Sequence, residues 1–401
     1  MLDLKSVVDL QKPSFYTDDP WPVYAQMRAQ APVFHYEDLN VWVVSKFNDV
    51  RYVATHPELF TSTQGAFLND ARMGENIVDM FFDPDSDMIG TVDGERHKAL
   101  RRALASSFAP RAIAKSEQPI RDYCVSLLDS LPVGEEFDFV ERVAVPLPIW
   151  AVCRHIGLPG DNIQQIREWS DQLQKLGTPI TREELLEAME DVKDANTYLN
   201  DQIDAKRSSP GPDMITNLLR IPDLSEKNLQ QLVLATLLGG NETARALLGS
   251  CIWALSQHPE QYELAKADPS RAAAVVEETL RWTPPVLGFM RTATTDLELN
   301  GARIKAGDRV YMLYPAANRD EEIFDDPARF DITRPQGMAH LAFGFGPHVC
   351  PGSGLARIEV TVLLEEFLTR FTGIEISGPP ARPDTILQYA YSSLPVTLTR
   401  G

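Results

Sequence analysis

The spacing of apolar residues divides the chain into a mixed first part, a long helical middle and an end that contains strands. Residues 20–30 have helical periodicity, and Val33–Tyr36 and Val41–Val44 alternate as a pair of strands does. From residue 93 to about residue 282 the pattern is largely helical, with breaks at prolines. This pattern predicts a mainly α-helical protein with small sheets at its periphery.

The longest predicted helix begins near Ser225, a good N-cap residue, and runs to about Gln257, just before a proline. At the rise of an α-helix it would be roughly 50 Å long, enough to cross the whole molecule. Four later stretches are strand-like, whereas residues 61–90 form a loop-rich segment with a short helix. The four stretches are Thr294–Leu299, Arg309–Leu313, Ile374–Ile376 and Val396–Thr399.

Composition narrows the class of protein. The chain has 401 residues and a formal net charge of −19, which argues against nucleic acid or an anionic membrane as a partner. Four scattered cysteines (Cys124, Cys153, Cys251 and Cys350) have neither disulfide nor zinc spacing, which indicates a reducing compartment. Because the N-terminus has no signal-peptide pattern and no run of about 18 apolar residues occurs, we expect a cytoplasmic protein without a membrane span.

The stretch from Phe343 to Gly352 reads Phe-Gly-Phe-Gly-Pro-His-Val-Cys-Pro-Gly and leads into an apolar, helix-like segment. A cysteine at the start of a helix lies at the positive end of the macrodipole, which favours the thiolate. Such a thiolate serves as a nucleophile, a redox group or a metal ligand. The alternative is a buried cysteine that packs as a small apolar side chain.

The spacing Phe-x-x-Gly-x-His-x-Cys-x-Gly matches at every fixed position, and through it the sequence resembles the cytochrome P450 family. The matching residues are Phe343, Gly346, His348, Cys350 and Gly352. The resemblance implies one cytochrome P450 domain over residues 1–401, with haem b between the long central helix and the helix after the cysteine. It makes Cys350 the ligand of the haem iron and the other four residues part of the haem site. Pro351 departs from the usual pattern because proline has no N–H to donate toward the sulfur.

The long helix contains Gly239-Gly240-Asn241-Glu242-Thr243. Two glycines inside a helix cost about 1 kcal/mol each relative to alanine, so their presence needs a reason. They suggest either that a flat ligand approaches the helix closely or that its backbone hydrogen bonds open locally. A buried acid beside a hydroxyl can pass protons. Alternatively, Thr243 bonds to its own helix and Glu242 faces water. The resemblance implies that Gly240 contacts haem and that Glu242 and Thr243 deliver protons during dioxygen activation.

Glu278 and Arg281 are neighbours on one helix face, although Glu277 is equally close to the arginine. The resemblance selects Glu278 and Arg281 as a buried structural pair. It makes Arg329 the third member, with Arg334 as a possible substitute. We expect this network to support folding and haem retention.

Haem carries two propionates, whose burial requires cationic or strong hydrogen-bonding partners. The resemblance puts His97, Arg101, Arg291 and His348 at the propionate-binding positions. It also assigns mostly apolar residues to the substrate pocket, although each of them fits a core position equally well. These are Phe81, Phe82, Leu234, Leu238, Gly239, Val286, Leu287, Phe289 and Leu394. Such a pocket suits a terpenoid, steroid, fatty acid or aromatic compound.

The function implied by the resemblance is a monomeric monooxygenase that inserts one oxygen atom from dioxygen into a C–H bond. Electrons would come from an iron–sulfur ferredoxin and its reductase, since the chain has no room for a fused flavin domain. The ferredoxin would dock near Lys98, Arg101 and Arg102, a basic cluster that is otherwise a solvated helix face.

Two other functions are weaker interpretations of the same sequence. A peroxide-driven peroxygenase of this family tends to lack the acid–alcohol pair, which is present here as Glu242 and Thr243. A non-catalytic haem sensor or carrier would not need a complete proton-delivery motif. Turnover with NAD(P)H, ferredoxin and reductase separates these alternatives from the monooxygenase.

Overall fold

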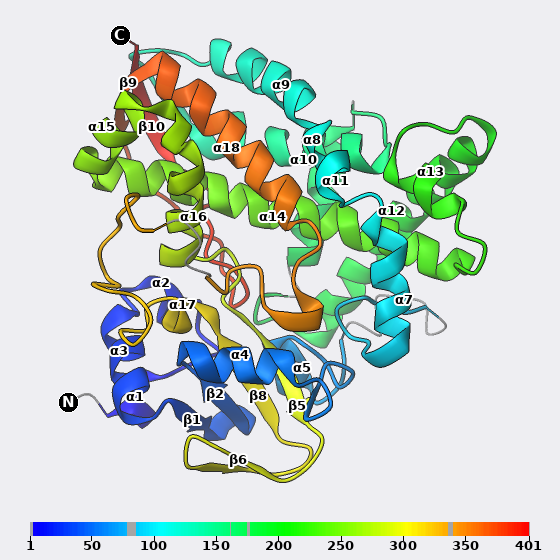
Figure 1. Cartoon of the computed structure of the whole chain (residues 1–401), viewed down its shortest axis with the longest axis vertical. Coiled ribbons are helices and arrows are strands. Elements are labelled where there is room, and N and C mark those ends of the chain that lie inside the picture. Colours follow the sequence, from blue (N-terminus) through cyan, green and yellow to red (C-terminus); the bar gives the residue numbers. More distant parts are fainter. Residues whose placement is uncertain (1–2, 78–85, 161, 175–176, 336–339, 401) are drawn as a thin grey trace.

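The computed structural model describes residues 3–77, 86–160, 162–174, 177–335 and 340–400. Figure 1 shows a large helical part above a smaller part that contains the main sheet and the N-terminal helices. None of the helices in these ranges combines the length and the hydropathy of a membrane span. The predicted mainly helical fold with small peripheral sheets is confirmed.

Helices make up most of the described chain. The α-helices are α1 (Leu4–Val7), α2 (Pro13–Thr17), α3 (Trp21–Gln30), α4 (Phe47–Thr55), α5 (Leu68–Met73), α7 (Gly94–Ala105), α8 (Pro110–Ala114), α9 (Glu117–Asp129), α10 (Pro146–Ile156), α11 (Ile163–Gln174), α12 (Arg182–Ser208), α13 (Met214–Leu219), α14 (Glu226–Gln257), α15 (Pro259–Ala267), α16 (Ala272–Trp282), α17 (Tyr314–Ala317) and α18 (Ser353–Arg370). Short 3-10 turns cover Glu37–Leu39, Pro269–Arg271 and Gly346–His348, and Val140–Ala144 form a π-helical turn.

In the described part of the chain, three sheets lie beside the helices. The largest has the strand order β1-β2-β8-β5-β3, in which β2 and β8 are parallel and the other pairs antiparallel. The others have the orders β4-β10-β9 and β6-β7. The strands are β1 (Val33–Tyr36), β2 (Val41–Val44), β3 (Phe60–Thr61), β4 (Glu136–Asp138), β5 (Gly288–Ala293), β6 (Leu297–Leu299), β7 (Ala302–Ile304), β8 (Arg309–Leu313), β9 (Phe371–Ile376) and β10 (Pro395–Arg400).

Helix α14 is the element around which the helical part is built. Ser225 is its N-cap, as predicted, and its hydroxyl accepts a hydrogen bond from the Asn228 amide at 3.2 Å. The helix packs against α10, α12, α16 and α18, and every residue from Ala244 to Leu255 except Trp253 is buried. A helix buried on so many sides gains most of its stability from tertiary packing.

The sequence-based boundaries hold for some elements and fail for others. Strands β1, β2 and β8 have the predicted limits, whereas Thr294 lies outside any strand and β5 was not predicted. Strand β4 also interrupts the stretch that was predicted to be helical. Strand β5 is hard to predict from the sequence because it begins at a glycine, Gly288, which is uncommon in strands. An added Cβ at this position would lie 2.3 Å from the Met312 carbonyl oxygen. Glycine is needed there for close approach of β5 and β8, not for a turn.

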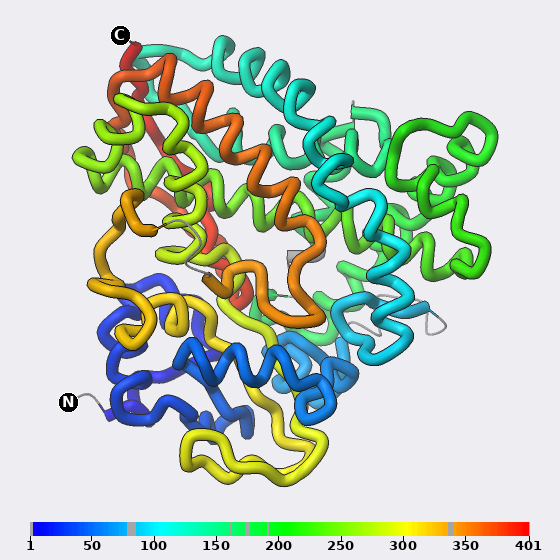
Figure 2. The backbone as a smooth tube through the Cα atoms, viewed as in Figure 1, coloured from blue at the N-terminus to red at the C-terminus, as the bar shows by residue number. Residues whose placement is uncertain are grey.

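The cysteine-containing loop leads directly into α18. In Figure 2 this orange segment lies between the blue segment of α4 and the green tube of α14. The 3-10 turn of the loop packs against α4, and α18 packs against α9 and α16. The loop is therefore held between the two parts of the molecule.

Candidate active site

A cavity of about 340 Å³ lies where the two parts of the molecule meet. Its wall combines α7, α14, β5 and the cysteine-containing loop, which are far apart in the sequence. It brings together most of the residues predicted for the haem site, together with Thr243 and three residues predicted for the substrate pocket. Those that line it are His97, Arg101, Gly239, Gly240, Thr243, Val286, Phe289, Arg291, Phe343, His348, Cys350 and Gly352.

The loop before α18 presents Cys350 to this cavity. Gly344 and Gly346 have φ values of +69° and +71°, in the left-handed region that favours glycine. An added Cβ on Gly346 would lie 2.6 Å from the Ala54 carbonyl oxygen, so this glycine shapes the loop without lining the cavity. The Cys350 amide donates to the Phe343 carbonyl oxygen at 2.9 Å, which closes the loop.

Burial raises the pKa of the Cys350 thiol, although the backbone N–H groups of Gly352 and Ser353 and the charge of Arg101 oppose this shift. The backbone N–H groups at the helix start favour the thiolate, as expected, but in the protein alone the effect of burial on the pKa is larger. Pro351 contributes no N–H, as expected from its ring.

Four basic side chains gather at the same cavity. The rings of His97 and His348 lie 4.1 Å apart, and His348 Nε2 lies 2.8 Å from Asp93 Oδ1. Burial, followed by the charges of His348 and Arg101, lowers the pKa of His97 to about 4. Arg101 donates through Nη1 to the Val349 carbonyl oxygen at 2.7 Å.

Two of these groups lack an acidic partner in the part of the chain that the structure describes. The buried His97 Nε2 has no hydrogen-bond partner there. Arg291 is 6% exposed, forms no ion pair and donates only to the carbonyl oxygen of Met290. Burial lowers the pKa of Arg291, which shows the cost of its desolvation. This donor set fits an apolar ligand with anionic groups, and the propionates of haem have that chemistry.

Glu242 and Thr243 point to different partners. The Thr243 hydroxyl donates to the Gly239 carbonyl oxygen at 3.0 Å, and Thr243 lines the cavity. Glu242 is buried, does not line the cavity, and its Oε2 lies 2.6 Å from Arg245 Nη2. Arg245 also contacts Asp171 on α11 at 3.3 Å. Burial raises the pKa of Glu242 to about 7, despite the opposing charge of Arg245.

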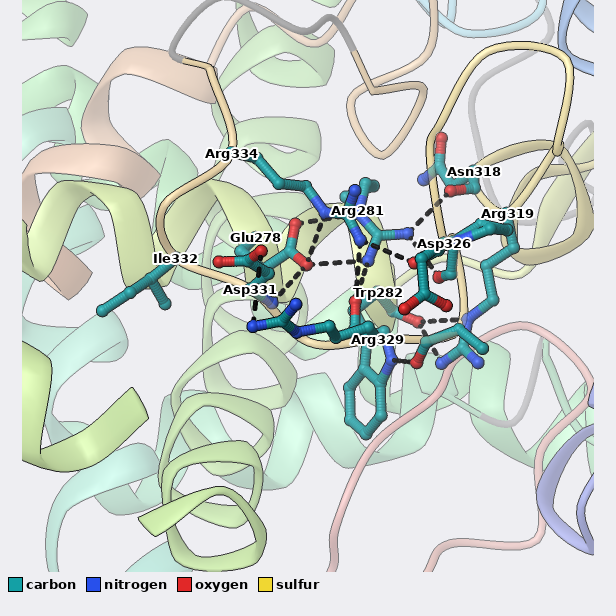
Figure 3. Close-up of polar contacts among 12 residues, drawn as sticks. Glu278, Arg281, Trp282, Asn318, Arg319, Asp326, Arg329, Asp331, Ile332 and Arg334 are labelled. Carbon is teal, nitrogen blue, oxygen red and sulfur yellow. Dashed lines mark hydrogen bonds and ion pairs between the residues drawn. The ribbon is translucent and has the colours of Figure 1, made fainter. Parts of the chain in front are cut away.

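Figure 3 shows the network around Glu278 and Arg281. Glu278 Oε1 accepts from Arg281 Nη2 at 2.7 Å and from the Asp331 amide at 2.8 Å. The third side chain in this network is Arg334, whose Nε lies 3.1 Å from Glu278 Oε1. The prediction of Arg329 is wrong, because its guanidinium is exposed and only its carbonyl oxygen accepts from Arg281.

The residues predicted for the substrate pocket divide into three groups. Gly239, Val286 and Phe289 line the cavity. Leu234, Leu287 and Leu394 are core side chains and Leu238 packs against the core, so these four do not line it. Phe81 and Phe82 lie outside the described residues.

Several lining residues and their supporting contacts were not predicted from the sequence. Met88, Ile89, Leu232 and Ala235 line the cavity. The i, i+3 spacing of Glu242 and Arg245 was a detectable signal for their ion pair. No local sequence signal connects Asp93 with His348, because their contact depends on the fold.

Comparisons with known proteins agree with this arrangement. The family model of cytochrome P450 matches residues 272–390. The erythromycin C-12 hydroxylase of Saccharopolyspora erythraea is 36% identical over 364 residues, with 89% of this chain and 88% of that protein covered. The linalool 8-monooxygenase of Pseudomonas putida is 30% identical, with coverage of 93% and 94%.

A solved structure of a mutant of P450 EryK in complex with erythromycin B has a TM-score of 0.84 and 33% sequence identity. The match covers 95% of this chain and 96% of that one. The similarity thus extends over nearly the whole fold. The chain belongs to the cytochrome P450 family and is a monooxygenase with haem b as its cofactor.

Proposed function

We propose that Cys350 is the protein ligand of the haem iron and that His97, Arg101, Arg291 and His348 hold the propionates. The observation that carries this proposal is the convergence of Cys350 with four basic groups at one cavity, two of which lack an acidic partner among the described residues. Metal ligation requires the thiolate, so a bound cation would reverse the effect of burial on the Cys350 pKa. When bound, haem supplies the activation of dioxygen and the transfer of one oxygen atom to the substrate.

Glu242 and Thr243 are proposed to move protons toward the cavity. Thr243 has its hydroxyl at the cavity wall, and Glu242 is the neighbouring acid with a pKa of about 7. An acid with a pKa near the working pH can both give up and regain a proton. The ion pair with Arg245 holds the Glu242 carboxylate away from the cavity, so delivery requires this contact to break.

Replacing Glu242 with glutamine should lower the rate of product formation by about 10²-fold, because glutamine cannot donate a carboxyl proton. With a pKa of about 7, the wild-type carboxyl is protonated below pH 7 and loses its proton above it. Product formation should therefore decline as pH rises through 7, and the Glu242→Gln variant should lose this inflection. A pH profile of product and peroxide yields tests this, and an unchanged inflection would exclude Glu242.

The substrate is proposed to be a small or medium-sized apolar compound. Ala66, Phe67, Met88, Val286 and Phe289 supply apolar surface to the cavity. Pockets of this kind bind ligands mainly through apolar contacts and use few polar groups for orientation. The related linalool 8-monooxygenase and erythromycin C-12 hydroxylase are named for a terpene alcohol and a macrolide.

A screen for a shift of the ferric Soret band tests the substrate class. Linalool, testosterone, a long-chain fatty acid and naphthalene form a suitable panel. A hit should then yield a hydroxylated product with NADPH, ferredoxin and reductase. Binding of charged, polar compounds in preference to all four would contradict the proposed class.

Electrons are proposed to come from a ferredoxin that docks on α7. Arg96 forms an ion pair with Asp87, and Lys98 forms one with Glu95. Because these acids partly neutralise the two charges, Arg96 and Lys98 attract an acidic partner less strongly. Arg101 faces the cavity, whereas Arg102 is exposed and has no ion pair among the described residues. Arg102 is therefore the best available contact for an acidic partner.

The Arg102→Glu variant should be reduced by a [2Fe–2S] ferredoxin about tenfold more slowly at low salt, because charge reversal removes electrostatic steering. Its rate should also depend less on ionic strength. Stopped-flow reduction measures both effects. Lys12→Glu, which changes an exposed charge outside α7, is the matched control. Equal rates for the wild type and Arg102→Glu would remove α7 from the docking proposal.

A further inference from the structure

The wall of the cavity contains one short segment whose shape depends on a buried carboxylate. Ala66 and Phe67 line the cavity just before α5. The Ala66 carbonyl oxygen accepts from the Met290 amide at 2.7 Å, and the ring of Phe67 contacts that of Phe289. These contacts join the segment to β5.

Asp70 connects this segment to the chain that follows α5. Its Oδ2 accepts from the Phe67 amide at 2.7 Å, and its Oδ1 accepts from the Ile77 amide at 2.8 Å. Asp70 is fully buried, and Ile77 belongs to the main hydrophobic core. A carboxylate at the third position of a helix often bonds to the N-cap amide. The bond to Ile77 goes beyond capping, because Ile77 lies after the end of α5.

The backbone around Asp70 is fitted closely to its carboxylate. Gly65 has a φ of +101°, and an added Cβ there would lie 2.6 Å from Asp70 Oδ2. Burial raises the pKa of Asp70 to about 6, while the backbone N–H groups of Phe67 and Ile77 oppose the shift. The carboxyl is therefore mainly ionised at neutral pH, when both oxygens can accept.

We propose that Asp70 is a positioning residue for substrate recognition, which holds the Ala66–Phe67 wall against the core. This goes beyond the proposed roles of the haem-site residues, because Asp70 does not line the cavity and acts through the backbone of its neighbours. Large ligands that reach this wall depend on it, whereas small ligands do not.

The Asp70→Asn variant tests the proposal with almost no change in size. Asparagine has one acceptor oxygen, so it can satisfy only one of the two amides, and its NH2 group faces the other. Asp320→Asn is the matched control. Asp320 is equally buried, and its two oxygens accept from the amides of Phe47 and Glu322, which do not line the cavity.

The affinities of two azoles, measured from the shift of the Soret band, test whether the Ala66–Phe67 wall is held in place. Imidazole is too small to need this wall, whereas clotrimazole is bulky. Asp70→Asn should weaken clotrimazole binding about tenfold and change imidazole binding less than about twofold. Asp320→Asn should change neither. Equal losses for both azoles, or an unchanged clotrimazole affinity, would overturn the proposal.

Hydrogen exchange gives a readout that does not depend on haem. The amides of Phe67 and Ile77 should exchange at least tenfold faster in Asp70→Asn, while those in the buried half of α14 keep the wild-type rate. Gly65→Ala should disturb the same wall and serves as the second variant should Asp70→Asn fail to fold. Unchanged exchange at both amides would also overturn the proposal.

Discussion

Replacing Cys350 with alanine should abolish the strongly red-shifted Soret band that the reduced protein gives with carbon monoxide. This band requires a thiolate opposite carbon monoxide, and Cys350 is the one cysteine that lines the cavity among the described residues. Catalytic turnover should fall with it, because the thiolate ligand favours O–O cleavage. The reduced carbon monoxide difference spectrum of purified protein measures the effect.

Two further variants make this result interpretable. Cys124→Ala removes a fully buried thiol on α9 and should retain the red-shifted band. Cys350→His keeps a side chain that can ligate iron, so it should retain haem with a less shifted band. A Cys350→Ala protein that binds haem and gives the wild-type spectrum would contradict the assignment.

Local sequence signals predicted the elements whose cap residues and apolar pattern lie within their own stretch of sequence. Ser225 and the helical pattern after it, which contains no proline before Pro259, were sufficient to predict α14. The two strands Val33–Tyr36 and Val41–Val44 are adjacent in sequence and pair with each other, so their alternation was also sufficient. Strand β5 pairs with β8 and β3 instead, and its pattern carries no such local signal.

The haem-site residues were predicted through a motif, whereas their electrostatic partners were not. The motif gave Cys350 and His348, but the pairing of His348 with Asp93 depends on how β3 and α7 approach the loop. The contact between Arg245 and Asp171 likewise joins α14 to α11. Long-range contacts of this kind have no periodicity in one sequence, so the fold is needed to find them.

The Arg329 prediction shows the same limit. Arg329 and Arg334 are five residues apart, and both lie in the loop that packs on α16. The family resemblance favoured Arg329, but its carbonyl oxygen accepts from Arg281 and its guanidinium is exposed. The direction of a side chain in an irregular loop is decided by its hydrogen bonds, and here these select Arg334.

Replacing Glu278 with alanine should destabilise the fold by about 3–5 kcal/mol, because it leaves Arg281 buried without its counter-charge. The loss also removes the acceptor for Arg334 Nε and the Asp331 amide. We therefore expect a lower midpoint in urea and faster haem release. Arg334→Ala should have a smaller effect, since Glu278 would still form its ion pair with Arg281.

Arg329→Ala is the control that separates this network from the sequence-based prediction. Its guanidinium is 60% exposed, and its only ion pair among the described residues is a 3.9 Å contact with Asp331. Exposed pairs of this kind contribute about 0–1 kcal/mol, so the urea midpoint should barely move. The carbonyl oxygen that accepts from Arg281 remains in this variant. A loss in Arg329→Ala equal to that in Glu278→Ala would contradict the role of Arg334, because the exposed guanidinium would then be part of the buried network.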